Sequence, residues 1–217
     1  MTPMQATAKY RALTYEGTAT GFVTDAQIYA DLWQGECELN SLLELYQAAT
    51  ALTTTTGTQE YSFPTDYIVI KRVTYDGDRL KAADFRELDS IDDKFTDSDS
   101  QTGDPTHYYL WAGKIGMWPV PDTSATVEIW GVKQPASITT NTAAFSIPLQ
   151  FTDFPLDYAL MNYYMKDQDD GRFQVYQARW ENDKQMAQRL WNRRRYADRL
   201  LTVKMEDQSA YTVLGMK

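Results

Sequence analysis

Residues 67–77 read Tyr-Ile-Val-Ile-Lys-Arg-Val-Thr-Tyr-Asp-Gly, a run typical of a β-strand that enters a tight turn. β-branched and aromatic residues favour strands, and the Asp76-Gly77 pair is a strong hairpin signal. Shorter runs of the same texture, separated by turn signals, surround it at residues 52–56, 60–63, 108–111, 115–118 and 126–132. Short strands with turns between them predict a compact β-module.

Helical patterns lie on both sides of this module. Thr24 and Gln27 form a capping-box pattern, which predicts the start of a helix that runs to about residue 48. One apolar face of this helix consists of Ile28, Leu32, Leu39, Leu42 and Tyr46. Gly35 lies on the same face, where it is either a tolerated glycine or a point of close approach by another backbone.

Two more helices are predicted near the C-terminus. Residues 156–165 are apolar nearly all round, which is typical of a central, buried helix. A helix of about 30 residues follows from Arg172 to near Leu201, or roughly 45 Å at 1.5 Å per residue. The segments 1–23 and 203–217 show no period and are interpreted as extended arms.

The expected fold class is therefore α+β, mainly α. It is a bundle of three long helices, with a small antiparallel β-module inserted between the first and second, and an extended arm at each terminus. The predicted domain bounds are 1–23 for the N-terminal arm, 24–49 for the first helix, 50–147 for the β-module with its acidic loop, 148–202 for the other two helices, and 203–217 for the C-terminal arm.

Composition excludes several function classes. The 217 residues include 21 basic and 30 acidic ones, and the net charge of -9 opposes binding to bare nucleic acid or anionic membrane. With one cysteine, Cys37, and one histidine, His107, the chain has no disulfide framework and no His-rich or Cys/His metal site. Phosphate-loop and dinucleotide-binding glycine motifs, a signal peptide and a membrane-spanning run are also missing. We therefore expect no cofactor, no metal and synthesis in the cytoplasm.

An acidic segment extends from Asp84 to Asp104. Its eight acids and two bases leave a local charge of -6. Asp97 and Asp99 resemble the start of a calcium-binding loop, but the later ligand positions do not match. A glycosidase carboxylate pair or a solvated charged loop are the other interpretations. If the segment faces a DNA channel, its charge repels phosphate. The residues assigned to such a channel or charged loop are Asp89, Asp92, Asp93, Asp97 and Asp99.

Basic residues gather in one place, within the last predicted helix. Arginine groups bind phosphates or acidic patches on a partner, although a solvated helix face is the plainer interpretation. In a chain of charge -9, this concentration favours an acidic protein partner. The predicted subunit or portal interface comprises Arg189, Arg193, Arg194, Arg195 and Arg199.

Aromatic residues crowd the β-module. They are either platforms for sugars or nucleobases, or part of the core, and strand alternation must send at least one set inward. The residues concerned are Tyr108, Tyr109, Trp111, Trp118 and Trp130. His107 is interpreted as a hydrogen-bonded residue at a strand end.

The order of motifs from residue 24 to about 200 resembles the head-to-tail adaptor (connector, or tail tubular protein A-like) proteins of short-tailed double-stranded DNA phages. After the first amphipathic helix come Leu52-Thr53-Thr54, Glu60-Tyr61-Ser62-Phe63-Pro64, Ile70 to Gly77, Gly103 to Trp111, Ile115 to Pro121 and Ile147-Pro148.

This resemblance implies a structural virion protein at the head-to-tail junction, without enzymatic activity. It implies a homo-oligomeric ring of twelve copies below the portal, which extends the DNA channel and provides the platform for tail attachment. The implied partners are the portal protein, a tail nozzle or tail tube protein, further copies of the chain, and double-stranded DNA that passes through during genome ejection without specific binding; no membrane is involved.

Two alternatives stay open. The aromatic β-module with its carboxylates also suits a carbohydrate-binding module or a glycosidase-like tail component, and a tail-completion or stopper protein is close in role. The arginine residues favour a ring interface, because a sugar-binding module has no use for them.

Overall fold

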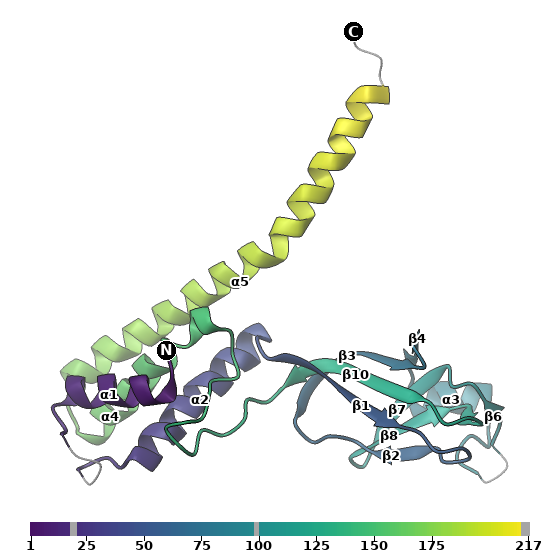
Figure 1. Ribbon diagram of the computed structural model, residues 1–217, viewed down its shortest axis with the longest axis horizontal. Helices are drawn as coiled ribbons and strands as arrows, with labels where there is room; N and C mark the ends of the chain where they lie inside the picture. Colours follow the sequence, from purple (N-terminus) through teal and green to yellow (C-terminus); the bar gives the residue numbers. More distant parts are fainter. Residues whose placement is uncertain (18–20, 98–99, 214–217) are drawn as a thin grey trace. The chain divides into compact units, whose positions relative to one another are not determined.

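The computed structural model describes residues 1–17, 21–97 and 100–213, with side chains described as far as Arg193. In this part of the chain there are five α-helices and ten strands in three sheets (Figure 1). The chain divides into a helical unit, residues 1–45 with 135–217, and a β-rich unit, residues 46–134.

The β-rich unit contains two four-stranded sheets and one two-stranded sheet. In the first sheet the order is β1 (Gln47–Thr53), β10 (Thr126–Lys133), β3 (Tyr67–Tyr75) and β4 (Asp78–Arg79), all antiparallel. In the second the order is β2 (Glu60–Ser62), β8 (Lys114–Trp118), β7 (His107–Trp111) and β5 (Lys81–Ala82). The third sheet pairs β6 (Thr102–Gly103) with β9 (Val120–Pro121). The β5–β7 and β6–β9 pairs are parallel.

Two apolar clusters hold this unit together. The larger one joins the two four-stranded sheets and includes Val73 on β3, Ile129 on β10 and Met117 on β8, all without solvent exposure. The smaller one lies under α3 (Phe85–Ile91), where Leu88 packs with Tyr109 and Trp118. The unit is therefore a sandwich with a short helix as an additional cover.

The helical unit is built around α4 (Pro155–Lys166), which packs against both α2 (Asp25–Leu43) and α5 (Asp170–Val213). A 3₁₀ turn, Leu149–Phe151, precedes α4. Trp180 on α5 is 2% exposed and lies edge-on to Tyr158 of α4, with ring centroids 5.3 Å apart. Burial of such large aromatic faces is the main source of stability for this unit.

Gly35 marks the closest approach between α2 and α4. A Cβ at this position would lie 3.0 Å from Cβ of Tyr158 and 3.2 Å from Cα of Pro155. Of the two interpretations of this glycine, close packing is therefore confirmed. The capping box at the start of α2 is also confirmed, because Thr24 and Gln27 exchange side-chain and backbone hydrogen bonds.

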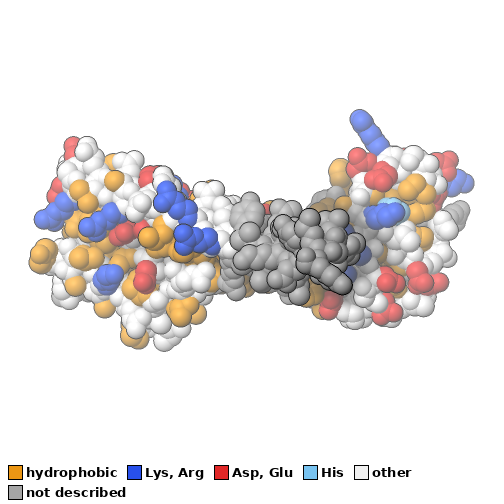
Figure 2. Space-filling view, turned by 90° about the horizontal axis from the view of Figure 1, so that it is seen from above, with side chains coloured by type: hydrophobic (Ala, Val, Ile, Leu, Met, Phe, Trp, Pro, Cys, Tyr) orange, Lys and Arg blue, Asp and Glu red, His pale blue; other side chains and the backbone are white. Residues whose placement is uncertain are grey.

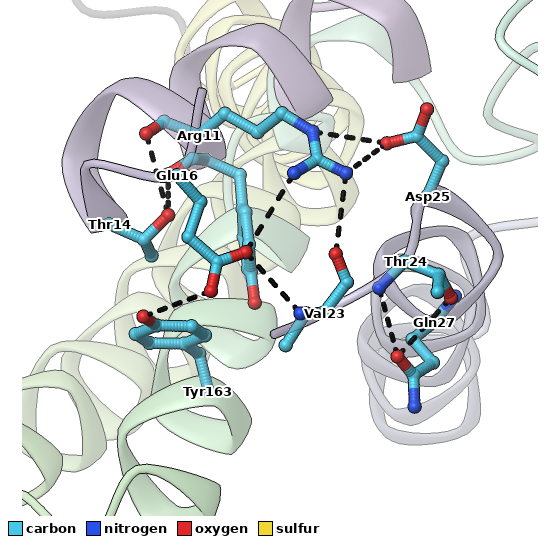
Figure 3. Close-up of polar contacts among 9 residues, drawn as sticks. Arg11, Thr14, Glu16, Val23, Thr24, Asp25, Gln27 and Tyr163 are labelled. Atoms are coloured by element: carbon cyan, nitrogen blue, oxygen red, sulfur yellow. Dashed lines mark hydrogen bonds and ion pairs between the residues drawn. The ribbon is translucent and has the colours of Figure 1, made fainter. Parts of the chain in front are cut away.

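The N-terminal segment forms helix α1 (Pro3–Thr14) and is not an arm. Its Arg11 guanidinium binds the Asp25 carboxylate and lies 3.8 Å from Glu16 (Figure 3). Glu16 in turn accepts a hydrogen bond from the Tyr163 hydroxyl of α4, at 3.4 Å. The side chains of Arg11 and Glu16 are 13% and 12% exposed, so this ion pair is largely shielded from water, whereas Asp25 is 37% exposed.

The predicted three-helix bundle with a small antiparallel module and two extended arms is therefore wrong. α1 has its own capping box and Pro3 in its first turn, and its buried stripe includes two threonines that conceal the apolar period. α5 continues as helix to Val213, through most of the predicted C-terminal arm; residues 214–217 lie outside the described part. The β-rich unit spans residues 46–134, and two of its strand pairings are parallel.

The first helix is also shorter than predicted. Glu44 adopts a left-handed conformation (φ 56°) and ends α2 at Leu43. Gln47 then starts β1, which pairs with β10 over its whole length. Strand pairing with residues about 80 positions away thus replaces the last turn of the expected helix, as tertiary contacts commonly override local propensity. The hairpin predicted at Asp76-Gly77 is confirmed: both residues have positive φ, and the turn joins β3 to β4.

Candidate interaction surfaces

The acidic segment of the β-rich unit comprises α3 and the loop that comes after this helix. Leu88 of α3 is fully buried on the inner side of this helix. The side chains of Asp89, Asp93 and Asp97 are exposed to solvent. Asp99 lies outside the described residues. On the face drawn in Figure 2, the acidic side chains of this unit form separate patches with apolar and basic atoms between them. The segment provides a dispersed negative surface.

Asp92 differs from its neighbours because it has specific partners. Its carboxylate accepts hydrogen bonds from the backbone N–H of Lys94 at 3.0 Å and from the indole N–H of Trp118 at 3.2 Å. These bonds favour the charged form and hold the pKa of Asp92 below its usual range. Asp92 therefore fixes the end of α3 to β8, which is a structural role within the predicted charged loop.

The predicted arginine interface lies on α5. The buried face of this helix carries Trp180 and Ala187, whereas Arg189 and Arg193, four residues apart, are both exposed. Arg194, Arg195 and Arg199 belong to the same helix, but their side chains lie outside the described part. The two arginines that can be placed are accessible to a partner.

The aromatic residues of the β-module divide between core and surface. Tyr109 and Trp118 pack in the cluster under α3, with 3% and 6% exposure, and Tyr108 packs in the cluster between the sheets. Trp111 and Trp130 are 59% and 47% exposed. On β7, Tyr108 and Tyr109 thus pack inward although they alternate along the strand. Of the five aromatic residues, Trp111 and Trp130 are the ones exposed enough to serve as platforms.

His107 is the first residue of β7, and its Nδ1 lies 2.8 Å from the Thr106 hydroxyl oxygen. The predicted strand-end position is therefore confirmed. No group of three or more His, Cys, Asp or Glu side chains in the described part of the chain could hold a metal ion. The segment that resembles the start of a calcium-binding loop, residues 97–108, forms loop and strand where it is described. Its described residues contain no such group of ligands.

Two carboxyl groups of the helical unit, the fully buried Glu36 and the half-buried Asp183, were not predicted from the sequence. Glu36 has no solvent exposure; its Oε1 accepts the N–H groups of Ser146 and Ile147, and burial raises its pKa to about 7. Asp183 on α5 is hydrogen-bonded to Asp157 on α4, and burial together with the charge of Asp157 raises its pKa. An acid on the buried side of α2, next to Leu32 and Leu39, is the signal that could have identified Glu36.

No helix among the described residues is both long enough and apolar enough to cross a membrane. The sequence has no significant match among curated proteins.

The model of the family described as SU10 adaptor protein matches residues 5–204. This match defines the class of protein as a structural adaptor of phages. The chain belongs to the SU10 adaptor protein family, a family of phage head-to-tail adaptors, so the resemblance seen in the motif order is confirmed. Membership implies a virion protein that associates with portal and tail components. It favours the adaptor over the carbohydrate-binding and glycosidase alternatives.

Proposed function

We propose that this adaptor forms a homo-oligomeric ring of twelve copies below the portal, extends the DNA channel and provides the platform for attachment of the tail nozzle or tail tube. Family membership supports the adaptor role. The observation that carries the finer proposal is the exposed arginine pair on α5, on a helix whose opposite face is buried in the unit. The protein acts as a structural component and catalyses no reaction.

The proposed interface includes the exposed Arg189 and Arg193, and we assign Arg194, Arg195 and Arg199 of the same helix to it as well. A ring requires two complementary surfaces on each subunit. Arginine suits an interface with carboxylates because its planar guanidinium binds them through two parallel hydrogen bonds. Since each copy carries a net charge of -9, acidic surface is available on a neighbouring copy.

The acidic segment borders the DNA channel in this proposal. Asp89, Asp93 and Asp97 are exposed, and Asp92 keeps the segment in place. The proposal also includes Asp99, which lies outside the described residues. A negative lining repels phosphate and lets DNA pass without sticking. With a Debye length of about 8 Å in physiological salt, neighbouring carboxylates overlap in their effect, so the field does not depend on any one of them.

The double variant Arg189→Glu/Arg193→Glu tests the interface. It should weaken ring formation on the portal by about a hundredfold or more, since reversing interfacial charges costs several kcal/mol. The fold should survive, because exposed charges contribute about 1 kcal/mol or less to folding. Sedimentation velocity without portal and electron microscopy with portal separate contacts between subunits from contacts with the portal.

A matched control carries the same change of charge elsewhere. Lys9 on α1 and Arg86 on α3 are both exposed, and Lys9→Glu/Arg86→Glu removes two positive charges and adds two negative ones, as the test variant does. The control should assemble as the natural chain does. Assembly of the test variant at natural strength, or equal loss in both variants, would show that the α5 arginines are not a specific interface.

A further inference from the structure

The two four-stranded sheets of the β-rich unit are only partly closed along one edge. β4 ends the first sheet and β5 ends the second, and the chain passes directly from one to the other through Leu80. β4 pairs with only Thr74 and Tyr75 of β3. Beside Ile68–Ile70, no strand of the described chain pairs with the outer edge of β3.

The backbone at this edge is oriented for pairing. The carbonyl oxygen of Val69 points toward β10, since it lies 2.3 Å from the position that a Cβ on Gly131 would occupy. In an antiparallel strand, successive residues direct their N–H and C=O groups to opposite sides. The register with β10 shifts at Ile68 and at Lys71, so this alternation applies to Ile70, which follows Val69 without a shift. The backbone groups of Ile70 therefore point outward, away from β10, where another strand could add.

An apolar groove lies alongside this edge, between β3 and β7. Its volume is about 560 Å³, and its walls include Ile68 and Ile70 from β3, Leu110 and Trp111 from β7, and Phe85 from α3. Ile68, Leu110 and Trp111 are between 46% and 59% exposed. Rows of exposed apolar side chains beside an open strand edge are unusual, because natural proteins normally protect such edges with charges or prolines.

The groove changes character along β3. A second hollow of about 550 Å³ adjoins it, and Ile70, Ala82 and Tyr108 line both. The second hollow is lined by basic side chains, among them Arg72, Arg79 and Lys81. One end of the open edge is therefore apolar and aromatic, and the other end is positively charged.

We propose that this groove binds an extended peptide segment of another protein, which adds as a strand to the outer edge of β3. Backbone hydrogen bonds to Ile70 would hold the segment beside the β3 edge, and alternate apolar side chains would enter the groove. Carboxylates at one end would meet the basic hollow. In antiparallel addition, the N-terminal end of the peptide lies near Arg72, so the acidic residues precede the apolar ones.

The observations favour a peptide over a nucleic acid. Aromatic side chains such as Phe85 and Trp111 line part of the groove, but Ile68, Ile70 and Leu110 add aliphatic walls that bases do not stack on. The net charge of -9 also opposes a polyanion. In the adaptor that we propose, the segment would come from a neighbouring virion protein. The binding itself involves only the β-rich unit, so it is testable without ring assembly.

The probe is a fluorescent peptide of sequence Asp-Asp-Val-Thr-Val-Thr-Leu, titrated into the full chain and followed by anisotropy. We expect a dissociation constant on the order of 10 µM. Replacement of both threonines by proline removes backbone donors and should abolish binding. Replacement of both aspartates by lysine should weaken binding at least about tenfold, because the carboxylates then no longer meet the basic hollow.

Variants of the chain locate the site. Leu110→Asp should weaken binding at least about tenfold, whereas Trp130→Asp, at an equally exposed position that does not line the groove, should leave it unchanged. Arg79→Glu/Lys81→Glu should reverse the preference between the aspartate and lysine peptides. Circular dichroism checks that each variant is folded.

Several outcomes would overturn this proposal: no binding of the aspartate peptide, equal binding of the proline peptide, or equal effects of Leu110→Asp and Trp130→Asp. Preferential binding of oligothymidine or of a glucose oligosaccharide would assign the groove to a nucleic acid or a carbohydrate instead. Because none of these measurements involves the α5 arginines or the portal, a negative result here leaves the ring proposal to its own test.

Discussion

Replacing Glu36 by glutamine should remove a pH-dependent loss of stability from the helical unit. The carboxyl group is fully buried, and its Oε2 has no hydrogen-bond partner among the described residues. Burial raises its pKa from 4.5 to about 7. At about 1.4 kcal/mol per pKa unit, this difference corresponds to about 3 kcal/mol.

The sign follows from proton binding. Below pH 4.5 the carboxyl of Glu36 is protonated in both the folded and the unfolded chain, and its contribution to stability is fully present. Between pH 4.5 and about 7 the unfolded chain releases the proton first, so the free energy of unfolding falls as the pH rises. Above pH 7 the group is ionised in both states, and the loss of about 3 kcal/mol is complete.

Glutamine imitates the protonated acid. Its Oε1 can still accept from Ser146 and Ile147, and its amide N–H₂ replaces an O–H that also lacks an acceptor. The Glu36→Gln variant should therefore match the natural chain at pH 5 within about 1 kcal/mol. At pH 8 it should be more stable by up to about 3 kcal/mol.

Urea unfolding from pH 5 to pH 8, followed by the helical circular dichroism signal, measures this difference. Glu38→Gln on the same helix is the matched control. Glu38 forms a partly exposed ion pair with Lys184, so its loss should cost about 1 kcal/mol or less. Parallel stability curves for Glu36→Gln and the natural chain would refute the assignment of the pH dependence to Glu36.

Two further substitutions test the packing of each unit. Gly35→Ala should destabilise the chain by about 1–3 kcal/mol in thermal unfolding, because its Cβ would press on Tyr158 and Pro155. Gly171→Ala on α5, whose Cβ would make only an ordinary contact with Asp169 at 3.5 Å, should stabilise it by about 0.5–1 kcal/mol. Equal effects would contradict the close helix contact. Asp92→Asn should lower the melting temperature of the β-rich unit at pH 7. The effect should be smaller in acid, because the stabilising charge of Asp92 is lost as the pH falls through its lowered pKa. Asp93→Asn should leave the melting temperature unchanged, and an equally silent Asp92→Asn would contradict the anchoring role of Asp92.

Local signals in the sequence were sufficient where the deciding contacts lie within a few residues. The capping box of Thr24 and Gln27 located the start of α2, and Asp76-Gly77 located a hairpin, because both are contacts between residues one to three positions apart. The order of motifs likewise identified the family. Thr2 and Gln5 form the same kind of capping box, but α1 was not predicted, because threonines interrupt the apolar stripe that follows.

Contacts between distant residues decided the rest. The sequence by itself determined the net charge, the helix start at Thr24, the turn at Asp76-Gly77 and the strand character of the β-rich unit. Glu36 lies on the apolar side of its helix, but only the tertiary structure decided which groups it meets, because its partners lie 110 and 111 residues away. It also decided that β4 and β5 would close only part of one sandwich edge. Burial and strand order depend on which distant segments meet, and local propensity carries no information about that choice.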